Sequence, residues 1–158
     1  MKDTDRPLTP GERKIAASMF GDAIDYDTVT INRRKYVFFQ QSKYVMAPNG
    51  HIWIHPKSDH WSEDFSAEGY ERQELFIHEM THVWQAQTKG RWYLPTHRHP
   101  WCKYEYTFVP GQKFEDYGIE QQAEMVRHAY CWKQGWTPYQ APPLAMIEPI
   151  LPFGPDRP

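Results

Sequence analysis

The sequence has few cysteines, no long apolar run and no excess of basic charge. Only two of its 158 residues are cysteines, which excludes the disulfide-dense scaffold of many small secreted domains. No segment approaches the roughly 20 consecutive apolar residues of a spanning helix, so we expect no membrane span. The 18 basic and 20 acidic residues give a net charge of -2, which argues against a nucleic-acid partner.

The N-terminal residues 1–7 also lack the apolar core of a signal peptide, so we expect synthesis in the cytoplasm without one. The length suits one globular domain, expected to occupy residues 1–158. Aromatic residues make up 16% of the chain. Because each aromatic side chain buries a large area, a small domain of this composition can still form a substantial core.

Local signals in the first third predict a helix followed by a small, mostly antiparallel sheet. Thr9 fits the N-cap of the helix, Pro10 its first position and Glu12 the third residue of a capping box, while Gly21 fits its end. Runs rich in β-branched and aromatic residues predict strands at 29–31, 36–39, 44–47 and 51–54. The last two flank Asn49-Gly50, which predicts a hairpin.

Two longer helices are predicted beyond the sheet, at 70–89 before Gly90 and at 116–133. Residues 91–115 have few helical repeats and many aromatics, so we expect an ordered excursion over the first of these helices. The proline-rich segment 138–158 predicts an extended tail that packs on the domain. The predicted fold class is therefore α+β, with a small sheet packed on two long helices.

One of these helices carries the H-E-x-x-H pattern, as His78-Glu79-Met80-Thr81-His82. Two histidines four residues apart lie one helical turn apart on the same face, where both imidazoles can bind one Zn²⁺. Glu79 lies beside the pair, placed to reach a metal-bound water without being a ligand. The sequence therefore predicts a zinc site with Glu79 as general base.

A catalytic zinc needs a third protein ligand, and the second helix offers a pair of acids one turn apart. Glu120 and Glu124 share a face of this helix. One would bind the metal, and the other would accept a hydrogen bond from a ligand imidazole and fix its tautomer. A solvated charged face is the alternative interpretation of the pair.

The motifs together resemble the gluzincin-type zinc metallopeptidases. Residues 8–12, 20–26 and 76–85 and the Pro48-Asn49-Gly50 turn further resemble the Vgr-related proteins, metallopeptidase-like domains found free or fused to VgrG spikes of bacterial type VI secretion systems. The resemblance implies a zincin-like fold, with His78, His82 and Glu120 as ligands and Glu124 as the acid behind a ligand. One departure is Glu124, where many gluzincins have aspartate.

The same resemblance implies the biological setting. It implies an antibacterial effector that hydrolyses a peptide or protein substrate, is delivered to a target cell by type VI secretion, and has a VgrG-type spike and a neutralising immunity protein as partners. Two alternatives stay open at this point. One is a zinc amidase or carboxypeptidase acting on peptidoglycan, and the other is a non-catalytic binding module on the same fold.

Attack of water on an amide carbonyl places negative charge on its oxygen, and an enzyme needs a group that stabilises this oxyanion. The sequence does not identify that group. His128 lies two turns after Glu120 on roughly the same stripe and is a candidate catalytic residue, although a packed structural histidine is the alternative. Tyr104, Tyr106 and Tyr117 are equally open.

Several other residues have an open role. The histidines at 51, 55, 60, 97 and 99 could form a second metal cluster, but they lack a fixed ligand spacing, which favours structural roles. The 51–54 strand is a candidate edge for pairing with substrate. Cys102 and Cys131 could form one disulfide or remain as two thiols.

Overall fold

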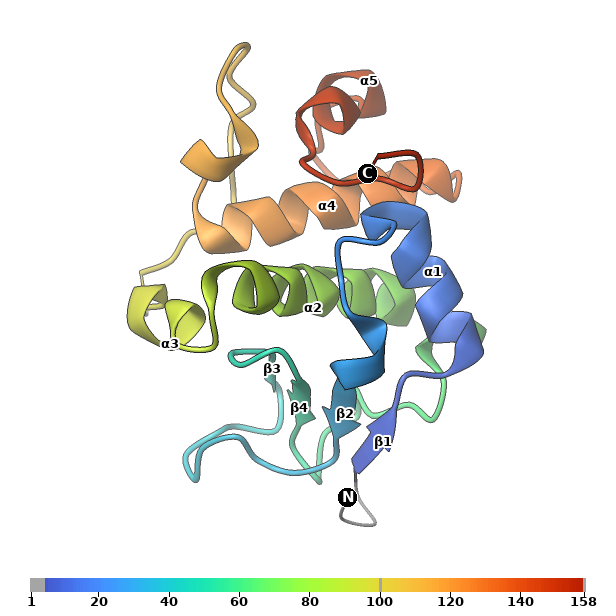
Figure 1. The fold of residues 1–158 in the computed structure, drawn as a ribbon, viewed down its shortest axis with the longest axis vertical. Coiled ribbons are helices and arrows are strands. Elements are labelled where there is room, and N and C mark those ends of the chain that lie inside the picture. The colour runs from blue at the N-terminus through green and yellow to red at the C-terminus, as the bar shows by residue number, and fades with distance from the viewer. Residues whose placement is uncertain (1–4, 100, 158) are drawn as a thin grey trace.

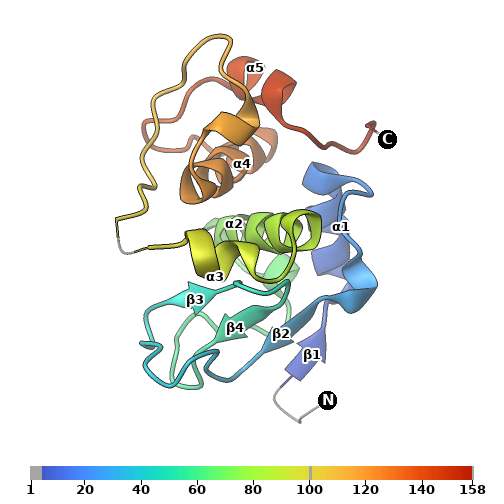
Figure 2. The same cartoon turned by 60° about the vertical axis from the view of Figure 1, so that its left-hand side comes forward.

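The computed structural model describes residues 5–99 and 101–157 and has an α+β architecture (Figure 1). A four-stranded sheet lies on one side of the long helix α2, and α4 lies on the other side (Figures 1 and 2). The α-helices are α1 (Pro10–Phe20), α2 (Tyr70–Lys89), α3 (Tyr93–His97), α4 (Ile119–Lys133) and α5 (Leu144–Ile147). The strands are β1 (Asp5–Pro7), β2 (Thr30–Asn32), β3 (Val45–Met46) and β4 (Ile52–Ile54).

Helix α1 begins and ends where its local signals predict. The Glu12 backbone N–H donates to the Thr9 hydroxyl at 3.0 Å, and the Glu12 carboxylate accepts from the Thr9 N–H at 2.9 Å, which completes the capping box. Gly21 ends the helix with a φ of 54°, and the carbonyl of Gly154 lies where a Cβ of residue 21 would be. Glycine is therefore needed there for both conformation and space.

The sheet is mixed, with strand order β1-β2-β4-β3. Strands β1 and β2 are antiparallel, as are β3 and β4, whereas β2 and β4 are parallel. The predicted hairpin is confirmed, with Val45 opposite Ile54 and Met46 opposite Trp53. The 51–54 strand, a candidate edge, is not one, because β4 lies between β2 and β3 and the edge strands of this sheet are β1 and β3.

The predicted strand at 36–39 is also wrong, since these residues form a turn. The aromatic and β-branched composition that favours a strand is present, but the described strands already pair with one another without this segment. Strand β1 was not anticipated, because its three polar and proline residues carry no strand pattern.

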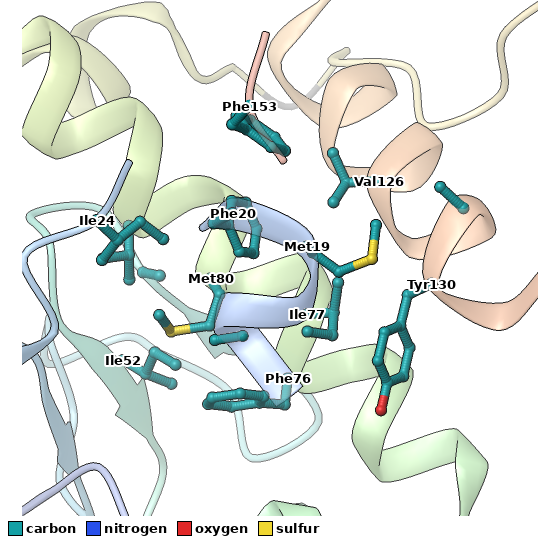
Figure 3. Packing of buried hydrophobic residues seen from close by; sticks show 14 of the residues in the cluster. Met19, Phe20, Ile24, Ile52, Phe76, Ile77, Met80, Val126, Tyr130 and Phe153 are labelled. Carbon is teal, nitrogen blue, oxygen red and sulfur yellow. The ribbon is translucent and has the colours of Figure 1, made fainter. Parts of the chain in front are cut away.

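Helix α2 has its predicted boundaries and forms the centre of the core. Its apolar side packs between the sheet, α1 and α4, and Figure 3 shows Phe76, Ile77 and Met80 of α2 among residues of these elements. All three side chains are at most 1% exposed. Because close packing on this side holds α2 in place, the two motif histidines on its opposite side have a rigid support.

The second predicted helix starts later than expected, since Phe114–Asp116 forms a separate 3-10 turn before α4 begins at Ile119. The excursion before it contains the short helix α3, which the sequence analysis did not predict. The C-terminal tail packs on the domain as predicted, with Ile147, Leu151 and Phe153 buried in the core. It is not wholly extended, because α5 and a following 3-10 turn lie within it.

Among the described residues, no helix is both long enough and apolar enough to cross a membrane.

Candidate metal centre

Three side chains from α2 and α4 converge at one point. The Nε2 atoms of His78 and His82 lie 3.2 Å apart. The Oε2 atom of Glu120 lies 3.2 Å from Nε2 of His78 and 3.0 Å from Nε2 of His82. All three residues are buried. The structure thus brings together the three residues that the sequence analysis assigned as ligands.

The spacing of these atoms fits a metal ion. Ligand atoms about 2.0–2.1 Å from a tetrahedral ion are separated by about 3.3 Å, close to the three separations here. Two buried carboxylate oxygens, Oε2 of Glu79 and Oε1 of Glu120, have no hydrogen-bond partner in the described part of the chain. Because buried polar atoms are nearly always satisfied, the Glu79 oxygen indicates that the site is built for a further group, whereas Oε1 of Glu120 has the Arg98 guanidinium 3.4 Å away.

Each ligand imidazole is oriented by a hydrogen bond on its other nitrogen. Nδ1 of His78 lies 3.1 Å from Oε1 of Glu124, and Nδ1 of His82 lies 2.8 Å from Oε1 of Gln85. The amide nitrogen of Gln85 donates to Gln122 and to the Ile119 carbonyl, which fixes the orientation of the amide. Since carboxylate and amide oxygens can only accept, both Nδ1 atoms donate, and the Nε2 atoms face the metal position.

The sequence analysis placed Glu124 in this role but missed Gln85. A signal was present, since Gln85 lies one turn after His82 on the same helix.

Behind Glu124, an arginine joins the two ligand-bearing helices. Arg127 donates from Nε and Nη2 to Oε2 of Glu124, at 2.8 and 2.5 Å. Its Nη1 lies 3.1 Å from Oε2 of Glu74 on α2, and the Cys131 thiol donates to the same oxygen at 3.0 Å. Arg127 therefore holds the carboxylate that orients His78.

The charges of the site depend on burial and on these close contacts. Burial lowers the pKa of His78, but hydrogen bonds to Glu120 and Glu124 outweigh it and raise the pKa to about 10. Burial raises the pKa of Glu124, but contacts with His78 and Arg127 outweigh it and lower the pKa to about 2. Without a metal, His78 therefore carries a proton that an incoming ion must displace.

Glu79 has a different environment from the other acids. Burial is the largest influence on its pKa and raises it, with the neighbouring histidines acting in the opposite direction. The side chain lines a cavity of about 490 Å³ beside the metal position, together with His78, Arg98 and Tyr104. A buried carboxylate of raised pKa in such a cavity is typical of a general base.

Two residues of the 91–115 segment reach the site. The Tyr104 ring stacks on the His78 ring, with centroids 5.9 Å apart and planes 18° apart. Arg98 places Nε 3.4 Å from Oε1 of Glu120 and donates from Nη2 to the Tyr104 hydroxyl at 3.4 Å. The sequence analysis considered Tyr104 but missed Arg98, because this segment has no periodic pattern to orient a side chain.

His128 lies outside the ligand cluster. Its Nδ1 is 2.8 Å from the Tyr106 hydroxyl, and its Nε2 is 3.2 Å from Nη2 of Arg127. Burial and Arg127 lower its pKa to about 4. It lines a second cavity of about 960 Å³, which shares Tyr104, Glu124 and Arg127 with the first.

The other residues that the sequence analysis left open lie away from the ligand cluster or make local contacts. Tyr117 is buried, and its hydroxyl accepts from the Val109 N–H. Among the described residues, only His78, His82 and Glu120 lie close enough together to hold a metal ion, so the other histidines do not form a second cluster. Cys102 and Cys131 are free thiols, so the disulfide alternative is wrong.

Comparison with known proteins identifies relatives of the chain. No family model matches the chain. It is 42% identical over 134 residues to the type VI secretion system spike protein VgrG2b of Pseudomonas aeruginosa. The solved effector domain of Pseudomonas aeruginosa VgrG2b matches with a TM-score of 0.69 and 37% identity, over 91% of this chain and 80% of that one. The chain belongs to the VgrG2b effector-domain family.

The alignment covers 81% of this chain but only 13% of the VgrG2b spike protein. The homology therefore concerns the effector domain of VgrG2b and not the spike as a whole. It confirms the resemblance to domains associated with VgrG proteins and connects the chain to type VI secretion effectors.

Proposed function

We propose that this protein is a zinc-dependent metallopeptidase of zincin-like fold, with residues 1–158 acting as one domain. The observation that carries this proposal is the convergence of His78, His82 and Glu120 beside the buried carboxylate of Glu79. Two imidazoles and one carboxylate form a donor set typical of catalytic zinc, which leaves one coordination position open.

Glu79 is the proposed general base. Zinc, when bound, would lower the pKa of a water molecule and polarise the carbonyl of the scissile amide. The Glu79 carboxylate would accept the proton of that water and transfer it to the leaving amine. Burial supports this role, because it raises the pKa of Glu79 and so makes the carboxylate a stronger base.

Donors for the developing oxyanion are also present in the cavity. The Tyr104 hydroxyl and the Arg98 guanidinium both line it beside Glu79. We assign this role to them and not to His128, because both ring nitrogens of His128 already contact Tyr106 and Arg127. His128 would instead support the hydrogen bonds around Glu124.

The family supports a biological setting for this chemistry. We infer that the protein is an antibacterial effector delivered to a target cell by type VI secretion, with a VgrG-type spike and a neutralising immunity protein as partners. Two substrate classes fit the motif, peptide bonds in protein and the amide bonds of peptidoglycan. Digestion of unfolded protein compared with digestion of purified peptidoglycan separates them.

The decisive test of the catalytic role is Glu79→Gln. The substitution keeps the size of the side chain and removes the base, so we expect zinc binding to be retained and hydrolysis or toxicity to fall by at least about 100-fold. Zinc content by elemental analysis and hydrolysis measured on the same preparation provide the two readouts. Full hydrolytic activity in this variant contradicts the role of Glu79 as general base, whereas a zinc-loaded unaltered chain that hydrolyses neither substrate would point to a binding module.

A further inference from the structure

The segment between β2 and β3, residues 33–44, has a composition that the catalytic site does not explain. It contains Arg33, Arg34, Lys35 and Lys43 and no acidic residue. Figures 1 and 2 show it projecting from the sheet side of the molecule. We refer to residues 33–44 as the aromatic loop.

Two phenylalanines form the tip of the aromatic loop. The Gln40 N–H donates to the Val37 carbonyl at 3.0 Å, so Phe38 and Phe39 are the central residues of a turn. Their rings contact each other edge to face, with centroids 5.1 Å apart. Phe38 is 86% exposed and Phe39 is 69% exposed. Turns favour glycine, asparagine, aspartate, serine and proline at these positions, so neither turn conformation nor core packing explains the two rings.

Hydrogen bonds from two side chains of the aromatic loop hold the backbone of the tip in place. The Gln40 side chain is buried, accepts from the Tyr36 N–H at 2.8 Å, and donates to the carbonyls of Tyr44 and Trp53 at 3.0 and 3.1 Å. The Lys35 ammonium donates to the Phe38 carbonyl at 3.1 Å. These hydrogen bonds hold the backbone that carries the two rings, which reduces the entropy cost of binding through the loop.

The cations around the tip are available to an anionic partner. Arg34 pairs with Asp5. In the described part of the chain, no ion pair involves Arg33, Lys35 or Lys43, and all three are exposed. Arg33 and Lys43 lie over the rings of Trp61 and Tyr44, which leaves their outer faces open.

We propose that the aromatic loop docks on an anionic phospholipid surface, with Phe38 and Phe39 entering the interface between headgroups and acyl chains. An apolar tip surrounded by cations is complementary to this layer, because the rings enter apolar material while the cations remain beside phosphates. A protein partner would need a pocket for both rings, and the projecting shape of the tip favours the membrane. Lys43 and Tyr44 also line the Glu79 cavity, so docking would bring that cavity to the membrane surface.

The test is co-sedimentation of the full chain, loaded with zinc, with lipid vesicles. We expect binding to vesicles of phosphatidylethanolamine containing phosphatidylglycerol, and at least about tenfold weaker binding to phosphatidylcholine vesicles or at high salt. Phe38→Ser/Phe39→Ser should lose at least about tenfold in partitioning. Arg33→Glu/Lys35→Glu should lose a similar factor on anionic vesicles only, since each cation contributes about fivefold.

Trp101→Ser is the matched control, because Trp101 is 80% exposed and lies outside the aromatic loop. It should bind vesicles as the unaltered chain does. Circular dichroism and zinc content check that each variant is folded, which we expect because the replaced rings lie mostly in solvent. No vesicle binding by the unaltered chain, or binding that survives Phe38→Ser/Phe39→Ser, overturns the proposal. The outcome is independent of hydrolysis, so failure here leaves the proposed catalytic function unaffected.

Discussion

Among single residues, Glu120 and Glu124 have different positions in the site, one at the candidate metal position and the other behind a histidine. They lie one turn apart on α4, yet Oε2 of Glu120 meets both Nε2 atoms, whereas Oε1 of Glu124 meets Nδ1 of His78. Glu120 is 1% exposed, and Glu124 faces both cavities and Arg127. One carboxylate is thus placed to bind the metal and the other to orient a ligand.

This division predicts different consequences for the two alanine variants. Glu120→Ala removes a ligand and should abolish tight zinc binding, whereas Glu124→Ala keeps all three ligands and should weaken binding about 10–100-fold. A zinc competition titration against a chromogenic chelator measures both. Loss of metal from Glu124→Ala with retention by Glu120→Ala would show that the roles are reversed.

At the scale of elements, α2 and α4 are joined by polar contacts beside the apolar ones. Arg127 and Cys131 on α4 both contact Oε2 of Glu74 on α2. Because these contacts lie between the helices that carry the ligands, they set the separation of the ligands as well as the packing of the helices.

Arg127→Gln should therefore affect both metal binding and stability. The carboxylates of Glu74 and Glu124 lose their shared cation, so we expect about tenfold weaker zinc binding and a free energy of unfolding lower by about 1–3 kcal/mol. Zinc titration and urea denaturation measure the two effects. Arg13→Gln is the control, since its pair with Asp27 is exposed and should contribute at most about 1 kcal/mol. Zinc binding by Arg127→Gln equal to that of the unaltered chain contradicts the positioning role.

The Cys131 thiol offers a pH-dependent test of the same contact. Burial, followed by the Glu74 carboxylate, raises the pKa of Cys131 to about 12. At pH 8 only about one thiol in ten thousand would then be the reactive thiolate, and the fraction rises with pH.

We expect a maleimide reagent at pH 8 to label Cys102 at least about tenfold faster than Cys131, because Cys131 is 1% exposed and Cys102 is partly exposed. Peptide mass spectrometry over time measures the two rates. Raising the pH toward 10 should accelerate labelling of Cys131, and unfolding in urea should make the two rates similar. Equal rates in the folded protein would show that Cys131 is not enclosed between the helices.

At the scale of the whole molecule, the metal position joins segments far apart in the chain. His78 and Glu120 are separated by 42 residues, on helices that are packed between the sheet and the C-terminal tail (Figure 1). A metal ion bound only by the folded state stabilises it by mass action.

Removal of zinc should therefore lower the melting temperature of the whole domain. With zinc at about a thousandfold excess over its Kd, the stabilisation is about 4 kcal/mol, which corresponds to a shift on the order of 10 °C. Differential scanning calorimetry with and without a chelator measures this shift. Glu120→Ala, which already lacks a ligand, should show little change on chelation, and an equally large shift in that variant would mean that the stabilising ion binds elsewhere.

Features that depend on residues near one another in the chain can be predicted from the sequence alone. The boundaries of α1 and α2 follow from the capping box at Thr9 and Glu12 and from Gly90, because caps and helical hydrogen bonds join residues three or four positions apart. The placement of His78, Glu79 and His82 on one helix follows from the same periodicity. Spacing and resemblance point to Glu120 and Glu124, and the structure places both beside His78.

Features that depend on contacts between distant segments become visible only in the folded protein. The parallel pairing of β2 with β4 and the edge position of β3 could not be read from the strands, because pairing partners are chosen by the whole sheet. Arg98 reaches Glu120 from a segment without a periodic pattern, and Arg127, although one helical turn from Glu124, contacts Glu74 only because α4 packs on α2. The run at 36–39 has strand composition but forms a turn, which the Gln40 N–H closes onto the Val37 carbonyl and the Gln40 side chain ties to Trp53 of β4. Local patterns specify helices and motifs, whereas burial and long-range hydrogen bonds determine which segments come into contact.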